Sequence, residues 1–237
     1  MIGDIAPSAF RMQPNSLILP AGTELWRVHS RTWAGDAFKD AVADEHFGGS
    51  RFDSTQRDPY PFLYTAMDPA TALAETLLRS TPFDPATTTR LIPYAAVRNR
   101  SLSRLRTRCD VRLIALITEE DLAAVCQSSW LLEEEGDGRY AKTRRWAVEM
   151  RAQDPGAMGL VWTSRRHRPR LAQMMFGDRF GEPPAAEEDE GGAGRFLGGP
   201  PPELVPGGGI AELGSPSGVA EANRLLAPLR AAIVPPW

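Results

Sequence analysis

The clearest pattern of apolar and polar positions lies in LYTAMDPATALAETLLR, residues 63–79. Its first residues are typical of a strand. Asp68 and Pro69 then form a helix start, with aspartate as the N-cap and proline in the first turn. At about 100° per residue, the apolar side chains of this helix share one face. They are Ala70, Leu73, Ala74, Leu77 and Leu78.

Glu75 lies on the flank of this apolar stripe, together with Thr71 and Arg79. One interpretation is a solvated Glu75–Arg79 ion pair at i, i+4, which contributes about 0.2–0.5 kcal/mol. The other is a carboxylate at the rim of a cleft. The periodicity alone favours the ion pair.

The rest of the chain alternates between strand and helix patterns without a regular order. Strands are predicted at 23–29, 50–53, 62–66, 91–97, 101–105, 111–117, 158–164 and 171–177. Further helices are predicted from the Thr118 cap through 122–127 and over 139–153. Because strands predominate and helices arrive irregularly, we expect an α+β fold rather than a doubly wound βαβ sheet.

The two ends of the chain differ from its middle. Residues 1–22 are rich in proline and are interpreted as a lead-in to a domain at 23–181. Residues 182–217 are mainly proline, glycine and acidic residues, so we predict a disordered linker. Helical spacing returns at 218–237, where Pro228 should interrupt the helix. This segment is expected to dock on the body of its own domain.

Composition narrows the class of protein. The 237 residues leave room for one good-sized domain and an appendage. The net charge of −3 argues against direct nucleic-acid binding. No apolar run approaches the roughly 20 residues of a membrane span, and the N-terminus lacks a secretory pattern. A cytoplasmic protein is expected.

The cysteines and histidines predict no metal site. Cys109 and Cys126 have no metal-ligand spacing, and we expect two reduced thiols with at least one of them buried. The three histidines are scattered along the chain. There is also no G-x-S-x-G elbow, P-loop or G-x-G-x-x-G after a strand.

Four further residues are candidates for chemistry, each with an ordinary alternative. Arg27 lies in a strand between apolar residues; an outward arginine whose stem covers apolar surface is favoured by roughly two to one. Arg51 could be a surface turn residue and Tyr64 simple core. Ser164 could end a strand ahead of a solvated basic loop, RRHRPR.

Taken in order, WRVH, GGSRFDS, LYTAMDPATALAET and GLVWTS resemble the motifs of the RES domain, a bacterial toxin family named for arginine, glutamate and serine. The resemblance spans about residues 24–180. The second motif departs from the family pattern, since it reads Arg-Phe-Asp rather than Arg-Trp-Asn and Ser50 separates Gly49 from its arginine. The matching positions are Arg27, Arg51, Tyr64, Glu75 and Ser164.

The resemblance implies an ADP-ribosyltransferase-like fold, with mostly antiparallel sheets, that consumes NAD by phosphorolysis, hydrolysis or ADP-ribosyl transfer to a protein. Glu75 would stabilise the oxocarbenium-like cation that forms when the nicotinamide–ribose bond breaks. Arg27 and Arg51 would hold the diphosphate. Tyr64 would stack on a ring, and Ser164 would orient a ribose or the glutamate.

The same resemblance implies the partners. NAD is a substrate rather than a cofactor, inorganic phosphate is a candidate co-substrate, and a helix-turn-helix antitoxin is expected; whether the chain forms a homodimer stays open. Two other classes remain as alternatives. One is a module that binds NAD without turnover, and the other is an interaction protein that acts through its C-terminal helix.

Overall fold

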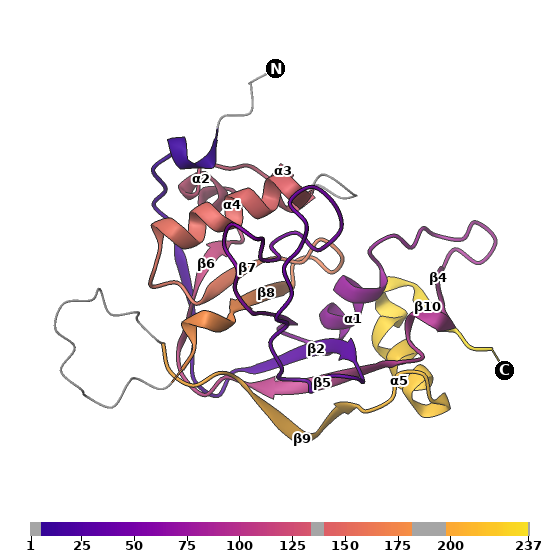
Figure 1. Ribbon diagram of the computed structural model, residues 1–237. Coiled ribbons are helices and arrows are strands. Elements are labelled where there is room, and N and C mark those ends of the chain that lie inside the picture. Colours follow the sequence, from indigo (N-terminus) through magenta and orange to yellow (C-terminus); the bar gives the residue numbers. More distant parts are fainter. Residues whose placement is uncertain (1–5, 134–139, 182–197, 237) are drawn as a thin grey trace.

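The computed structural model describes residues 6–133, 140–181 and 198–236 (Figure 1). An eight-stranded sheet has the order β1-β6-β7-β8-β3-β2-β5-β9. Within it β6 and β7 run parallel, and the other neighbouring strands are antiparallel. The strands are β1 (Ser16–Leu19), β2 (Glu24–Ser30), β3 (Phe62–Ala66), β5 (Arg100–Arg106), β6 (Val111–Leu116), β7 (Gly159–Thr163), β8 (Leu171–Phe176) and β9 (Glu203–Ile210).

A second, two-stranded sheet pairs β10 (Ala231–Val234) in parallel with β4 (Arg90–Pro93). The α-helices are α1 (Pro69–Leu77), α2 (Glu119–Ala124), α3 (Trp130–Glu133), α4 (Tyr140–Gln153) and α5 (Pro216–Leu226). Short 3-10 helices lie at Pro7–Ala9, Tyr94–Ala96, Gly177–Arg179 and Ala227–Leu229. The architecture confirms the predicted α+β class with mostly antiparallel strands.

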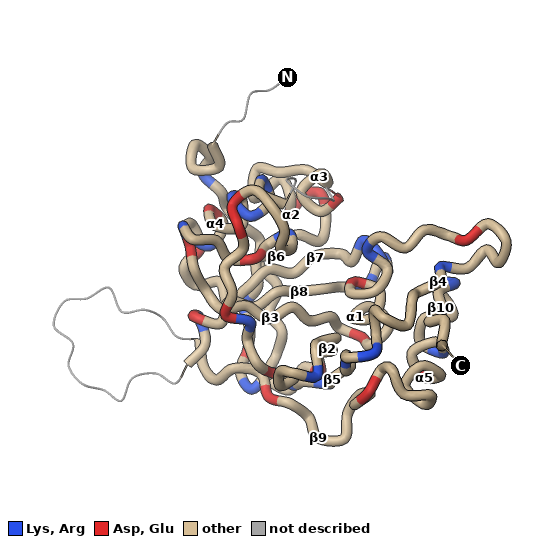
Figure 2. Tube along the Cα trace, turned by 45° about the vertical axis from the view of Figure 1, so that its right-hand side comes forward, with Lys and Arg blue, Asp and Glu red and all other residues tan. Residues whose placement is uncertain are grey.

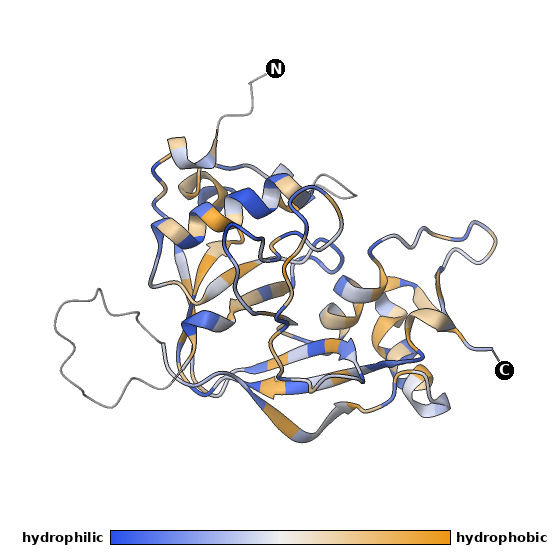
Figure 3. Cartoon of the chain, in the orientation of Figure 1, coloured by the Kyte–Doolittle hydropathy of each residue, from blue (hydrophilic) through white to orange (hydrophobic). Residues whose placement is uncertain are grey.

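Two groups of helices cover different parts of the large sheet. Figure 1 shows α2, α3 and α4 gathered over β6, β7 and β8, with α1 and α5 beside β2 and β5. The first group buries a core that includes Leu131, Trp146 and Leu160. The second buries Leu73, Val219 and Leu226. A third apolar cluster includes Leu63 and Met175, which are cross-strand partners. Figure 3 shows apolar and polar segments along the strands of the sheet.

The strand and helix predicted around Glu75 are confirmed. β3 covers the predicted residues 62–66, and α1 starts at Pro69 after an Asp68 N-cap. Asp68 Oδ1 accepts a hydrogen bond from the Thr71 amide at 2.9 Å, which satisfies one of the unpaired donors at the helix start. α1 buries Leu73, Ala74 and Leu77, and so Glu75 stays on the flank of the buried face.

Three predictions in the first half of the chain are wrong. Residues 16–19 are not part of a lead-in, because they form β1, an edge strand that pairs with β6; an edge tolerates flanking prolines. Residues 50–53 form a turn instead of a strand, in which Asp53 Oδ2 accepts from the Ser50 amide at 2.9 Å. In the 91–97 segment the strand ends at Pro93 and a 3-10 turn follows.

The predicted linker at 182–217 is wrong over residues 203–210, which form β9 on the edge of the sheet beside β5. Residues 182–197 lie outside the described part of the chain. Glycine suits β9, because a Cβ on Gly209 would lie 2.0 Å from the Leu102 carbonyl oxygen. The prediction from composition failed because backbone hydrogen bonds order this strand. The strand itself buries little apolar surface.

The C-terminal segment is partly as predicted. α5 begins at Pro216 and ends at Leu226, Pro228 lies in the 3-10 turn that follows, and α5 packs against α1. Docking on the body of its own domain is therefore confirmed. Residues 231–234, expected to be helical, form β10 instead.

The cysteine prediction is half right. Cys109 and Cys126 are both free thiols, but Cys109 is only half-buried and Cys126 is exposed. Neither is fully buried.

Candidate active site

A cavity of about 480 Å³ opens between α1, strands β2 and β3, the turn at 50–53 and the start of α4. Arg27, Arg51, Tyr64 and Glu75 all line it. Ser164 lies behind Glu75 with 0% of its surface exposed, and its Oγ donates to Glu75 Oε1 at 2.6 Å. The five residues predicted from separate motifs therefore converge on one place.

Glu75 faces the cavity because the apolar stripe of α1 faces the core. Within the described residues it forms no ion pair with Arg79 and it lines the cavity, so the solvated-pair interpretation is wrong. The Arg79 guanidinium instead lies 5.8 Å from the centroid of the Tyr140 ring. The Ser164 hydroxyl also accepts from the His167 amide at 3.1 Å, which leaves its own proton for Glu75.

Two backbone carbonyl groups hold the Arg27 guanidinium. Its Nη1 donates to the carbonyl oxygens of Gly35 at 2.9 Å and Ala37 at 2.6 Å. Burial lowers the pKa of Arg27 to about 10, which the charge of Asp36 partly opposes. The side chain is thus a fixed cation at neutral pH, and the interpretation of an outward surface arginine is wrong.

Arg51 is fixed in a similar way. Its Nη1 donates to the Leu131 carbonyl oxygen at 2.6 Å, and its guanidinium lies 5.4 Å from the centroid of the Tyr140 ring. Burial lowers the pKa of Arg51, while Tyr140 and Glu75 act in the other direction. Arg51 is therefore a wall of the cavity rather than a surface turn residue.

Tyr64 belongs both to the core and to the cavity. Its hydroxyl oxygen accepts from the Phe52 amide at 3.1 Å, and its ring meets Trp162 edge-on with centroids 6.2 Å apart. Burial, followed by the charge of Asp53, raises the pKa of Tyr64 well above its usual value. The phenol therefore keeps its proton at neutral pH.

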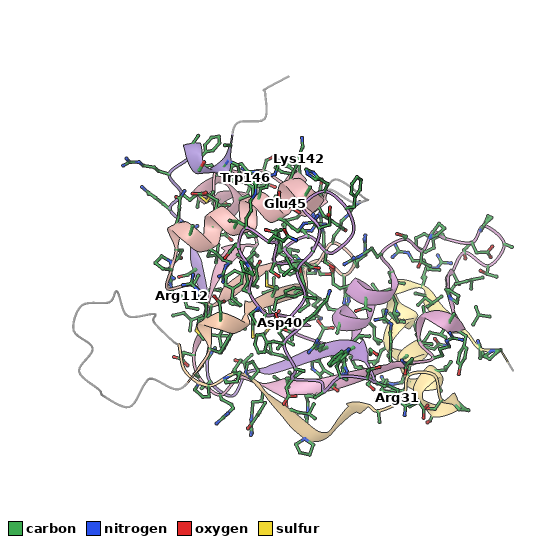
Figure 4. The ribbon with its side chains drawn as sticks, in the orientation of Figure 1. Arg31, Asp40, Glu45, Arg112, Lys142 and Trp146 are labelled. Atoms are coloured by element: carbon green, nitrogen blue, oxygen red, sulfur yellow. The ribbon has the colours of Figure 1, made fainter. Side chains whose placement is uncertain are left out.

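The loop between β2 and β3 carries Arg51 to the cavity, and Figure 4 labels Arg31, Asp40 and Glu45 along its course. Arg144 on α4, with 1% of its surface exposed, anchors this loop. Its Nη1 donates to the Gly48 carbonyl oxygen at 2.9 Å and its Nη2 to that of Asp44 at 2.7 Å. The turn at 50–53 is thereby tied to α4.

Positive charge collects at the cavity although the whole chain is acidic. Seven Lys and Arg side chains line it against two carboxylates. Figure 2 shows basic segments beside α1 and at the end of β7. A basic, partly enclosed cavity attracts anionic ligands. The lining charges are Arg27, Lys39, Arg51, Arg79, Arg100, Arg165 and Arg166, with Asp53 and Glu75.

Sequence reasoning missed two parts of this cavity. It assigned Arg165 and Arg166 to a solvated loop, yet both line the cavity, and burial lowers the pKa of Arg166 while Glu75 raises it. Their place directly after Ser164 was the available signal. Tyr140, the first residue of α4, lies under the guanidinium groups of Arg51 and Arg79, and nothing in the sequence marks it.

The described residues contain neither a cluster of metal ligands nor a membrane-spanning helix. Over residues 6–133, 140–181 and 198–236, no three His, Cys, Asp or Glu side chains come together as metal ligands. Within the same part of the chain, none of the helices has the length and apolar character that crossing a bilayer requires.

Comparison with known proteins identifies the family. A model of the RES domain matches residues 24–194, well over half of the chain. The chain therefore belongs to the RES domain family, as the order of its motifs suggested. No curated protein matches its sequence significantly.

One solved structure with a similar fold is that of the M. tuberculosis MbcT–MbcA toxin–antitoxin complex. It has 12% sequence identity and a TM-score of 0.44, and the match covers 68% of this chain and 76% of that one.

Proposed function

We propose that this chain cleaves the nicotinamide–ribose bond of NAD. The observation that carries the proposal is the Glu75 carboxylate, which accepts a hydrogen bond from Ser164 at 2.6 Å and faces a cavity whose charged side chains are mostly cations. The cations would bind a diphosphate-containing ligand, and the single oriented glutamate would stabilise a cationic transition state. Membership of the RES family supports the same substrate.

The chemistry assigns one task to Glu75. As the C–N bond breaks, its electron pair leaves with neutral nicotinamide, and positive charge develops on the ribose C1 and ring oxygen. A carboxylate already oriented beside that carbon stabilises the charge without reorganising. Because Ser164 is fully buried, it orients Glu75 rather than a ribose. An incoming nucleophile then bonds to C1: water does so with loss of a proton to solvent, and phosphate does so through one of its anionic oxygens.

Arg27 and Arg51 are proposed to hold the diphosphate. Lysine at either position would keep the charge but lose the planar pair of donors. We expect Arg27→Lys and Arg51→Lys each to raise KM for NAD by about tenfold, the usual order for one charge-assisted hydrogen bond. Steady-state kinetics would show this, with Arg57→Lys, an exposed arginine of the same loop, as control. An unchanged KM in both variants would remove the arginines from the substrate site.

The nucleophile that bonds to C1 decides which activity the site has. Phosphorolysis would release ADP-ribose 1″-phosphate, hydrolysis would release ADP-ribose, and transfer would label a protein. Separating the products of NAD turnover with and without inorganic phosphate distinguishes these three. Tight NAD binding with no product would instead favour a binding module.

A regulated toxin is the proposed setting. RES family membership motivates a cytoplasmic role in which a helix-turn-helix antitoxin restrains NAD consumption. Expression of the chain alone should lower cellular NAD and stop growth, and co-expression of the antitoxin should restore both. Normal growth with unchanged NAD, at confirmed expression of folded protein, would contradict this setting.

A further inference from the structure

The loop between β7 and β8 lies along one flank of α1 and the turn that follows this helix. Thr71 and Glu75 are four residues apart and share that flank, and Arg79 lies in the turn. The loop contacts each of them in turn. His167 Nδ1 lies 2.8 Å from Thr71 Oγ1, Ser164 Oγ lies 2.6 Å from Glu75 Oε1, and Arg166 Nη2 lies 3.0 Å from the Arg79 carbonyl oxygen.

The direction of the hydrogen bond at His167 follows from counting protons. Thr71 has one hydroxyl proton, and it is donated to Asp68 Oδ2 at 2.6 Å. Thr71 Oγ1 must therefore accept from His167, which places a proton on Nδ1. The Asp68 carboxylate, only 3.8 Å from Nδ1, favours the same arrangement.

His167 also fixes the orientation of Ser164, the hydrogen-bond partner of Glu75. The backbone amide of His167 donates to Ser164 Oγ at 3.1 Å, so the serine proton is directed to Glu75. Two further bonds close the loop, from the Ser164 amide to the Arg170 carbonyl oxygen at 2.7 Å and from the Arg170 amide to that of His167 at 2.9 Å. A continuous path thus joins the N-cap of α1, through the His167 ring and amide, to the Glu75 carboxylate.

We propose that His167 is a positioning residue for Glu75, acting with Thr71. Its side chain locks the loop onto the first turn of α1, and its amide then holds Ser164 in the geometry that orients the carboxylate. This inference rests on the proposed function, because it assigns Glu75 the catalytic charge. The competing explanation is that His167 only stabilises the fold.

Two pairs of variants separate these explanations. Asparagine at 167 places its amide nitrogen where Nδ1 lies and keeps the donor to Thr71, whereas glutamine reaches the position of Nε2 and loses that donor. Likewise Thr71→Ser keeps the hydroxyl and Thr71→Val removes it at nearly constant shape. We expect His167→Gln and Thr71→Val to lower kcat by roughly ten- to a hundredfold, as small displacements of a catalytic group do.

In the same assays KM for NAD should stay within about twofold, and His167→Asn and Thr71→Ser should retain most of kcat. In a Ser164→Ala background, His167→Gln should lower kcat no further, because its effect passes through the serine. Equal kcat for His167→Gln and His167→Asn, or an equally large loss in the Ser164→Ala background, would overturn the proposal. A lower melting temperature in His167→Gln and Thr71→Val with unchanged kcat would also overturn the proposal.

A measurement without substrate keeps the two proposals distinguishable. Amide hydrogen exchange at Ser164, His167 and Arg170 should be at least tenfold faster in His167→Gln than in His167→Asn, because the loop is released from α1. If the wild-type protein is inactive and the variants show this exchange pattern, only the proposed function is contradicted. If the wild-type protein is active and exchange is identical in both variants, only the positioning role is contradicted.

Discussion

Replacing Glu75 with glutamine is expected to lower the rate of NAD cleavage by about 10²–10³, roughly 3–4 kcal/mol of barrier. Glutamine keeps the size of the side chain and an oxygen that can accept from Ser164 Oγ, now 2.6 Å from Glu75 Oε1. It removes the negative charge that faces the developing cation. NAD binding should survive, since the proposed diphosphate contacts are made by Arg27 and Arg51.

Thermal melting and kinetics together make this prediction decisive. The melting temperature of Glu75→Gln should lie within a few degrees of the wild type, because Glu75 forms no ion pair with another residue in the described part of the chain. Glu119→Gln, an exposed glutamate at the start of α2, is the matched control and should leave the rate unchanged. Turnover by Glu75→Gln at close to the parental rate would end the catalytic assignment.

Truncating Leu226 to alanine is expected to destabilise the protein by about 2–5 kcal/mol. Leu226 ends α5 with 0% of its surface exposed, in the same cluster as Leu73 and Leu77 of α1. Alanine would leave a cavity between the two helices. Because α1 carries Glu75, the C-terminal segment supports the site although it lies beyond the matched residues 24–194.

Urea denaturation followed by circular dichroism would measure this loss. Arg224→Ala, an exposed position of the same helix whose partner is Glu221, should change stability by less than about 1 kcal/mol. Equal stability of Leu226→Ala and Arg224→Ala would show that α5 is not part of the folded core. It would then favour the alternative of an interaction protein that acts through its C-terminal helix.

Local signals in the sequence were sufficient for the elements that carry the site. The Asp68 cap and the apolar stripe defined α1, and the same spacing placed Thr71 and Glu75 on one flank. Arg79, predicted on that flank as well, lies in the turn after the helix. Each signal acts within a few residues, where capping and helical geometry operate. The motif series then joined Arg27, Arg51, Tyr64 and Ser164 to the helix, although only a family resemblance indicated that they converge.

The rest depends on tertiary contacts that no local pattern encodes. β1 and β9 are the edge strands of the large sheet, and β10 belongs to the two-stranded sheet. Backbone hydrogen bonds to β6, β5 and β4 order them. Residues that are ordered by backbone pairing need little apolar periodicity. The sequence of 203–210 was therefore interpreted as a linker. Arg165 and Arg166 likewise looked solvated, because only the docking of their loop on α1 turns them toward the cavity.

The most direct test of the central claim is release of nicotinamide from NAD by the purified full-length chain, followed by proton NMR with and without inorganic phosphate. The wild-type protein should release nicotinamide, and Glu75→Gln at equal folded concentration should release it about 10²–10³ times more slowly. ADP-ribose or its 1″-phosphate should appear in equal amount unless a protein acceptor is present. NAD that stays intact with folded wild-type protein, in either buffer, would show that the chain does not cleave NAD.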